Sequence, residues 1–131
     1  MDVKWPTHGK LVKKFTELGP YLRGEQSSKE CYFFDCLAAC VSAKPAAEVR
    51  EFYGWWMQLV VTEQGFEYNY TWGIYNEKGD WDECAIPKKH QEEVTKSLDV
   101  FYQKLLNLLD ELSLPIEASA SLSPSQALPA A

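Results

Sequence analysis

The sequence predicts a single domain of the α/β class, of the α+β type, in which a small antiparallel sheet of three to four strands packs with helices. The clearest observation is the stretch 66–75, where large apolar residues occupy every second position: Phe66, Tyr68, Tyr70, Trp72 and Ile74. Such alternation is typical of a half-buried antiparallel strand. Residues 62–65, TEQG, precede it as a turn, so this strand should pair with the stretch before it as a hairpin.

A long C-terminal helix, residues 91–112, is the second observation behind this fold class. Its apolar side chains recur at spacings of three and four residues and form one stripe: Val94, Leu98, Phe101, Leu105, Leu108 and Leu112. The stripe would also suit a coiled coil. We favour packing on the sheet, because the aromatic face of the hairpin needs a cover.

The chain is organised around the stretch 48–62, EVREFYGWWMQLVVT. Its second half is rich in β-branched and large apolar residues, which predicts a buried strand. Its first half holds Arg50, Phe52 and Trp55, which are residue types enriched at binding hot spots. Alternation would place Phe52 and Trp55 on opposite faces, but a bulge at Gly54 would bring them to the same side. This half is therefore a candidate binding surface, although large aromatic residues more often lie in cores.

The N-terminal part predicts one helix and one loop. The helix begins at Thr7 or His8, runs to Leu18 with an apolar stripe, and is followed by Gly19 as a helix-ending glycine. The loop covers the polar stretch 21–30.

The segments around the central stretch are less regular. Residues 31–43 are apolar on both faces, so they predict a buried strand or a buried helix, with the strand favoured. Residues 45–48 suit one helical turn with proline at its first position. Residues 76–81, NEKGDW, predict a turn that carries the conspicuous Trp81.

Composition divides the chain into a domain, residues 1–113, and a tail, residues 114–131. The tail is dominated by Ser, Ala and Pro and has few large apolar residues. Such a composition buries too little surface to offset the entropy of ordering. We therefore expect the tail to be disordered and dispensable.

Charge and hydropathy exclude several classes of function. The formal net charge is −6 and the pI is about 4.9, which argues against a protein that binds nucleic acid directly. No apolar run approaches the length of a membrane span, so no membrane association is expected. The N-terminal residues lack the apolar segment of a signal peptide, which indicates a cytoplasmic protein.

The four cysteines, Cys31, Cys36, Cys40 and Cys84, do not have the spacing of a zinc site. In a reducing cytoplasm they should be free thiols, and we predict no metal. Phosphate-binding glycine loops and hydrolase motifs are absent from the sequence. Asp35, Glu48 and Glu51 lie near the core strands, but nothing in the sequence selects a catalytic pair. We therefore predict no enzyme activity, no catalytic residues and no cofactor.

Three stretches of the sequence resemble a known family. They are KLVKKFTELGPYLR (residues 10–23), FFDCLAACVSAKPAAEVREFYGWWMQL (residues 33–59) and KGDW (residues 78–81). These motifs resemble those of Crl, a family of bacterial proteins that bind the stationary-phase sigma factor. The resemblance covers the chain up to about residue 113.

The resemblance implies a transcription activator that does not read DNA itself. It implies binding to conserved region 2 of the stationary-phase sigma factor and assembly of that factor with core RNA polymerase, which activates a regulon that includes curli genes. The resemblance does not specify whether the protein also contacts core RNA polymerase. The family surface combines an aromatic cleft with an arginine that pairs with an acidic motif on the sigma factor. Residue by residue, it corresponds to Tyr21, Arg23, Arg50, Phe52, Trp55 and Trp81, so the resemblance favours Arg50, Phe52 and Trp55 as surface contacts.

Two other functions compete with this interpretation. A helix over a curved sheet can leave an apolar pocket, as in a domain that binds a small apolar ligand. The third class is an enzyme that would use the carboxylates near the strands for catalysis.

Overall fold

The computed structural model describes residues 6–42, 46, 50–120 and 122. Its elements follow the order α1 (His8–Thr16), η1 (Gly24–Gln26), β1 (Cys31–Cys40), β2 (Phe52–Val61), β3 (Phe66–Tyr75), β4 (Trp81–Glu83), α2 (Lys88–Glu111) and β5 (Ile116–Ala118). Among these residues, no helix is both long and apolar enough to cross a membrane. The predicted helical turn at residues 45–48 falls on positions that, apart from Ala46, are not described.

The sheet confirms the predicted α+β arrangement. Its strands lie in the order β1-β2-β3-β4, each antiparallel to the next, and β5 pairs in parallel with β3. The expected hairpin is β2–β3, with Val61 opposite Phe66 across the turn. Within the stretch 31–43, which suited either a strand or a helix, residues Cys31–Cys40 form strand β1.

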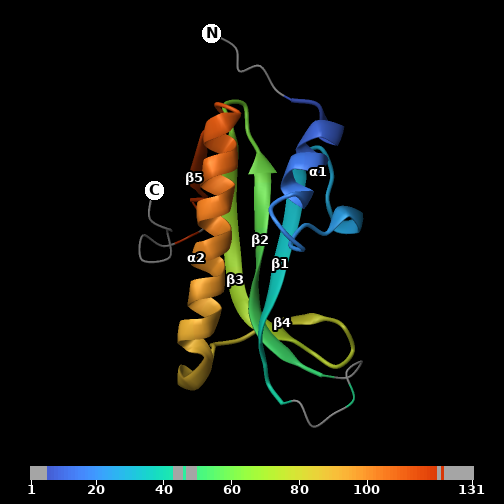
Figure 1. Cartoon of the computed structure of the whole chain (residues 1–131), viewed down its shortest axis with the longest axis vertical. Coiled ribbons are helices and arrows are strands. Elements are labelled where there is room, and N and C mark those ends of the chain that lie inside the picture. Colours follow the sequence, from blue (N-terminus) through green and yellow to red (C-terminus); the bar gives the residue numbers. More distant parts are fainter. Residues whose placement is uncertain (1–5, 43–45, 47–49, 121, 123–131) are drawn as a thin grey trace.

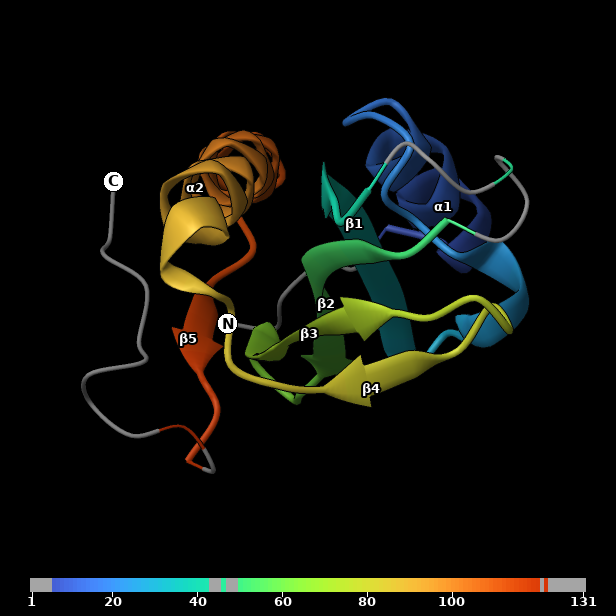
Figure 2. The same cartoon turned by 90° about the horizontal axis from the view of Figure 1, so that it is seen from below.

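Both helices cover the same side of the sheet, which we call the helix face (Figures 1 and 2). Phe15 of α1 packs against Phe34 at 5.3 Å between ring centroids, and Phe101 of α2 packs against Phe34 at 5.1 Å. The predicted stripe of α2 is buried from Val94 to Leu108, so the helix packs on the sheet as expected. Neither α1 nor α2 covers the opposite side of the sheet, which we call the outer face (Figure 2).

The bulge lies in β1 and not at Gly54, so the prediction of a bulge at this glycine is wrong. β2 pairs with β3 without interruption through Gly54 and Gly73, whereas the β1–β2 register shifts between Leu37 and Ala39. The glycine is needed for a close approach instead, because a Cβ atom at Gly54 would lie 1.9 Å from the backbone oxygen of Cys36. A Cβ atom at Gly73 would lie 2.7 Å from the Trp56 ring. The two glycines therefore allow close approach of the neighbouring backbone and, at Gly73, of the Trp56 ring.

The fold continues past Ser113, so the expectation of a disordered tail from residue 114 is wrong for its first residues. α2 ends with Ser113 at a positive φ of 57°, and Leu114 donates its backbone N–H to Leu109, five residues back. This bond pattern is a Schellman-type helix end, which reverses the chain direction. Leu114 then enters the core and β5 joins the sheet beside β3.

Candidate functional site

The outer face carries an aromatic patch formed by three neighbouring strands. Phe52 lies opposite Tyr75 and Tyr75 opposite Trp81 in the strand register, so the three side chains share one face. Trp56 lies on the same face of β2 as Phe52, because the two are four residues apart. The Trp81 ring packs against Trp56 at 5.1 Å and against Tyr75 at 5.3 Å between centroids. We call these four residues the outer-face patch.

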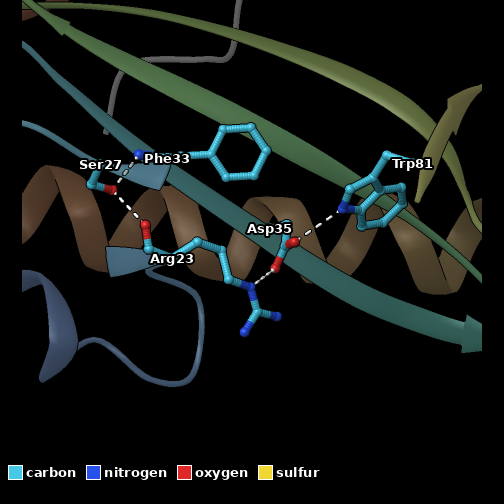
Figure 3. Close-up of polar contacts among 5 residues, drawn as sticks. All are labelled: Arg23, Ser27, Phe33, Asp35 and Trp81. Atoms are coloured by element: carbon cyan, nitrogen blue, oxygen red, sulfur yellow. Dashed lines mark hydrogen bonds and ion pairs between the residues drawn. The ribbon is translucent and has the colours of Figure 1, made fainter. Parts of the chain in front are cut away.

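A charged pair lies beside this patch. Asp35 of β1 is opposite Trp56 and is only 3% exposed. Its Oδ1 accepts a hydrogen bond from Arg23 Nε at 2.6 Å, and its Oδ2 accepts one from Trp81 Nε1 at 3.0 Å (Figure 3). The carboxylate thus joins two segments that are far apart in the sequence.

Backbone contacts fix the position of Arg23 along the edge of β1. Its N–H donates to the carbonyl of Phe33 at 2.8 Å. The Ser27 hydroxyl donates to the Arg23 carbonyl at 2.8 Å and accepts from the Phe33 N–H at 2.9 Å (Figure 3). Two of these bonds tie the segment to β1 and the third closes the segment on itself, so Arg23 has a defined place beside Asp35.

Between these segments the outer face is hollowed into an open groove of about 490 Å³. One wall is the Arg23 segment with Glu25 and Gln26, the other is the turn before Trp81, and Asp35 and Trp56 line the floor. The groove therefore combines aromatic side chains with both signs of charge. Aromatic residues and arginine are enriched in protein–protein interfaces.

The structure divides five of the six predicted contact residues between the two faces, and the sixth, Arg50, lies just before β2. Phe52 and Trp81 lie in the outer-face patch and Arg23 lies next to it. Arg50 is half-buried just before β2, where the Val41 N–H still donates to the Glu51 carbonyl and continues the β1–β2 pairing. Arg50 thus lies two residues before Phe52, the first residue of β2.

Tyr21 and Trp55 belong to the other side of the sheet. Trp55 is 0% exposed, and its indole N–H donates to the Ser97 hydroxyl of α2 at 3.0 Å. Tyr21 is half-buried and stacks on Trp55 with an interplanar angle of 21°, and burial raises its pKa. The expectation that Trp55 is a surface residue is therefore wrong, because its strand position points it at α2.

Sequence reasoning missed Asp35, Trp56 and Tyr75 as members of the site. Asp35 was considered only as a catalytic carboxylate, although a lone acid inside an apolar strand is itself an indication of a buried pair. Gln58, a polar residue between Met57 and Leu59, indicated which face of β2 is outward, and Trp56 shares that face.

The thiols lie outside this groove. All four cysteines are unpaired, and burial raises the pKa of the Cys36 thiol, which lies on the helix face near Ser97. A buried thiol with a raised pKa stays protonated and is a poor nucleophile. Within the described part of the chain, no three His, Cys, Asp or Glu side chains gather closely enough to hold a metal ion.

Comparison with known proteins identifies the family. A family model described as "Sigma factor-binding transcriptional regulator Crl" matches residues 1–126. The chain belongs to the Crl family. A relative from Photobacterium profundum, named "Sigma factor-binding protein Crl", is 50% identical over 122 residues, which is 92% of each chain.

Relatives from Vibrio carry the same printed name. The protein of Vibrio vulnificus is 47% identical over 106 residues, which is 81% of this chain and 82% of the relative. That of Vibrio cholerae is 45% identical over 108 residues, which is 82% of this chain and 84% of the relative. These printed names describe sigma-factor-binding proteins.

Proposed function

We propose that this chain binds the stationary-phase sigma factor, through conserved region 2 of that factor, and promotes its assembly with core RNA polymerase. Binding would activate the transcription of a regulon that includes curli genes. Membership of the Crl family supports the regulatory role. The observation that supports this binding surface is the outer-face patch, with Arg23 beside it and Arg50 just before the start of β2.

The proposed contact surface comprises Arg23, Arg50, Phe52 and Trp81, and it continues around the β1 edge to the half-buried Tyr21. Arginine suits this place because its planar fork can hold a partner carboxylate with two hydrogen bonds. Flat aromatic rings beside it exclude water and strengthen such a pair. Trp55 would contribute from below, by supporting Tyr21.

In this role the protein would act in the cytoplasm, would catalyse no reaction and would need no cofactor. A net charge of −6 disfavours binding to DNA phosphates, so activation would operate through the sigma factor. The competing idea of an apolar ligand pocket under α2 finds no support, because that space is filled by Trp55 and Phe101, whose ring centroids lie 5.0 Å apart.

Replacement of Arg50 tests the polar anchor of this surface. We expect Arg50→Ala to weaken binding to the isolated region 2 of the sigma factor at least about tenfold, because close charge pairs across interfaces couple by about 1.5–7 kcal/mol. Arg50→Asp should abolish binding, since it places like charges against each other. Isothermal titration calorimetry measures both effects.

The matched control removes a cation from the other side of the molecule. Lys96 is exposed on α2, so Lys96→Ala should leave the affinity unchanged. An acidic-to-arginine change in the sigma factor should partly restore binding to Arg50→Asp. Parental affinity of Arg50→Ala, or unfolding as its only effect, would refute the anchor role.

A further inference from the structure

Asp35 is an unusual residue for a sheet of this size. Among the residues that the structure describes, it is the one charged side chain that is buried. A buried ion is costly, and a buried ion pair is often no more stabilising than apolar residues of similar volume. Stability alone therefore gives little reason for a carboxylate at this position.

The geometry of the pair shows what the carboxylate does. It binds Arg23 through Nε, on the inner edge of the guanidinium, at 2.6 Å. The two terminal nitrogens point away from Asp35 (Figure 3), and the Arg23 side chain is 36% exposed. A guanidinium can grip a carboxylate by its Nε edge or by its two terminal nitrogens. Because Asp35 occupies the Nε edge, the terminal pair is the edge that would receive a partner carboxylate.

The second oxygen of Asp35 fixes the other wall of the groove. Its bond to the Trp81 indole spans 46 positions of the sequence and holds the ring over the outer face. One carboxylate thus sets both the direction of the Arg23 fork and the place of the neighbouring aromatic ring. Groups fixed in advance lose less entropy when a partner binds.

We propose that Asp35 is a positioning residue for partner binding, which orients the terminal nitrogens of Arg23 to receive a carboxylate of the sigma factor. Asp35 itself does not contact the partner. This role rests on the proposed function, and it makes the effect of Asp35 dependent on the presence of Arg23.

A double-mutant cycle in the full chain tests this dependence. Asp35→Asn keeps an oxygen that can accept from Trp81 but removes the charge that holds Arg23. We expect Arg23→Ala to weaken binding to the stationary-phase sigma factor about tenfold and Asp35→Asn about fivefold. In the Arg23→Ala background, Asp35→Asn should have no further effect on affinity, as measured by calorimetry on variants whose near-ultraviolet circular dichroism shows the parental fold.

Arg23→Lys provides a test that does not depend on the folding of the Asp35 variant. Lysine keeps the charge but lacks the planar fork of arginine. The affinity of the Arg23→Lys variant for the sigma factor should therefore fall nearly as far as that of Arg23→Ala. Parental binding by Arg23→Lys would overturn the inference. So would parental binding by Asp35→Asn, or an equal loss from Asp35→Asn with and without Arg23, which would show that Asp35 acts independently.

The outcomes separate this inference from the proposed function. If the parental chain fails to bind the sigma factor, the proposed function is wrong and the inference falls with it. If the parent binds and Arg50→Ala weakens binding while Asp35→Asn does not, the inference alone is wrong.

Discussion

Trp55→Ala should lower the free energy of unfolding by about 3–5 kcal/mol, because it removes a fully buried aromatic side chain from the centre of the core. Three contacts of Trp55 would be lost together. Its ring packs against Phe101 at 5.0 Å and under Tyr21 at 6.0 Å, and its indole N–H binds the Ser97 hydroxyl. Loss of the last contact leaves Ser97 with its bond to the carbonyl of Val94. Urea unfolding followed by circular dichroism measures the effect.

The neighbouring tryptophan is the matched control. Trp56 is half-buried on the outer face, so Trp56→Ala should lower stability much less than Trp55→Ala. Under the proposed function, it should weaken sigma-factor binding instead, since it removes the floor of the groove. If Trp55→Ala unfolds like the parent, or if the two variants lose equal stability, the assignment of the two faces is wrong.

Truncation after Ser113 should also destabilise the protein by several kcal/mol. Leu114 is 4% exposed, and removal of one buried leucine side chain alone costs about 2–5 kcal/mol. The truncation also removes two backbone hydrogen bonds to β3: the Phe66 N–H donates to the Pro115 carbonyl at 2.9 Å, and the Ser119 N–H donates to the Tyr68 carbonyl at 2.8 Å. Thermal unfolding detects the loss.

Truncation after Leu122 is the control for this experiment. It removes residues 123–131, which contain few large apolar side chains, and should leave the unfolding temperature close to that of the parent. The original expectation of a dispensable tail thus applies only to these last residues. Parental stability of the chain that ends at Ser113 would show that β5 contributes nothing.

Local patterns predicted the elements of this fold well. The alternation in β3 and the stripe in α2 depend on side chains within one element, so the sequence alone defines them. β5 was missed for the opposite reason. It has three residues, lies in a segment dominated by Ser, Ala and Pro, and forms only because the reversal at Ser113 brings the chain back beside β3.

The site was harder to predict, because its contacts join distant segments. Arg23 and Trp81 were both named as candidates, but the carboxylate that connects them lies on a third segment, and the sequence does not show the connection. Trp55 was misplaced because its residue type is common at binding surfaces. The alternation with Gln58 indicated the correct face, yet the assumed bulge at Gly54 reversed it.

The central claim is that the sigma factor binds the outer face, and amide hydrogen exchange of the full chain with and without the stationary-phase sigma factor tests it most directly. The account predicts slower exchange on binding in residues 21–27 and 76–83 and at the start of β2, with α2 unchanged. Slower exchange along α2, with residues 21–27 and 76–83 unaffected, would contradict it.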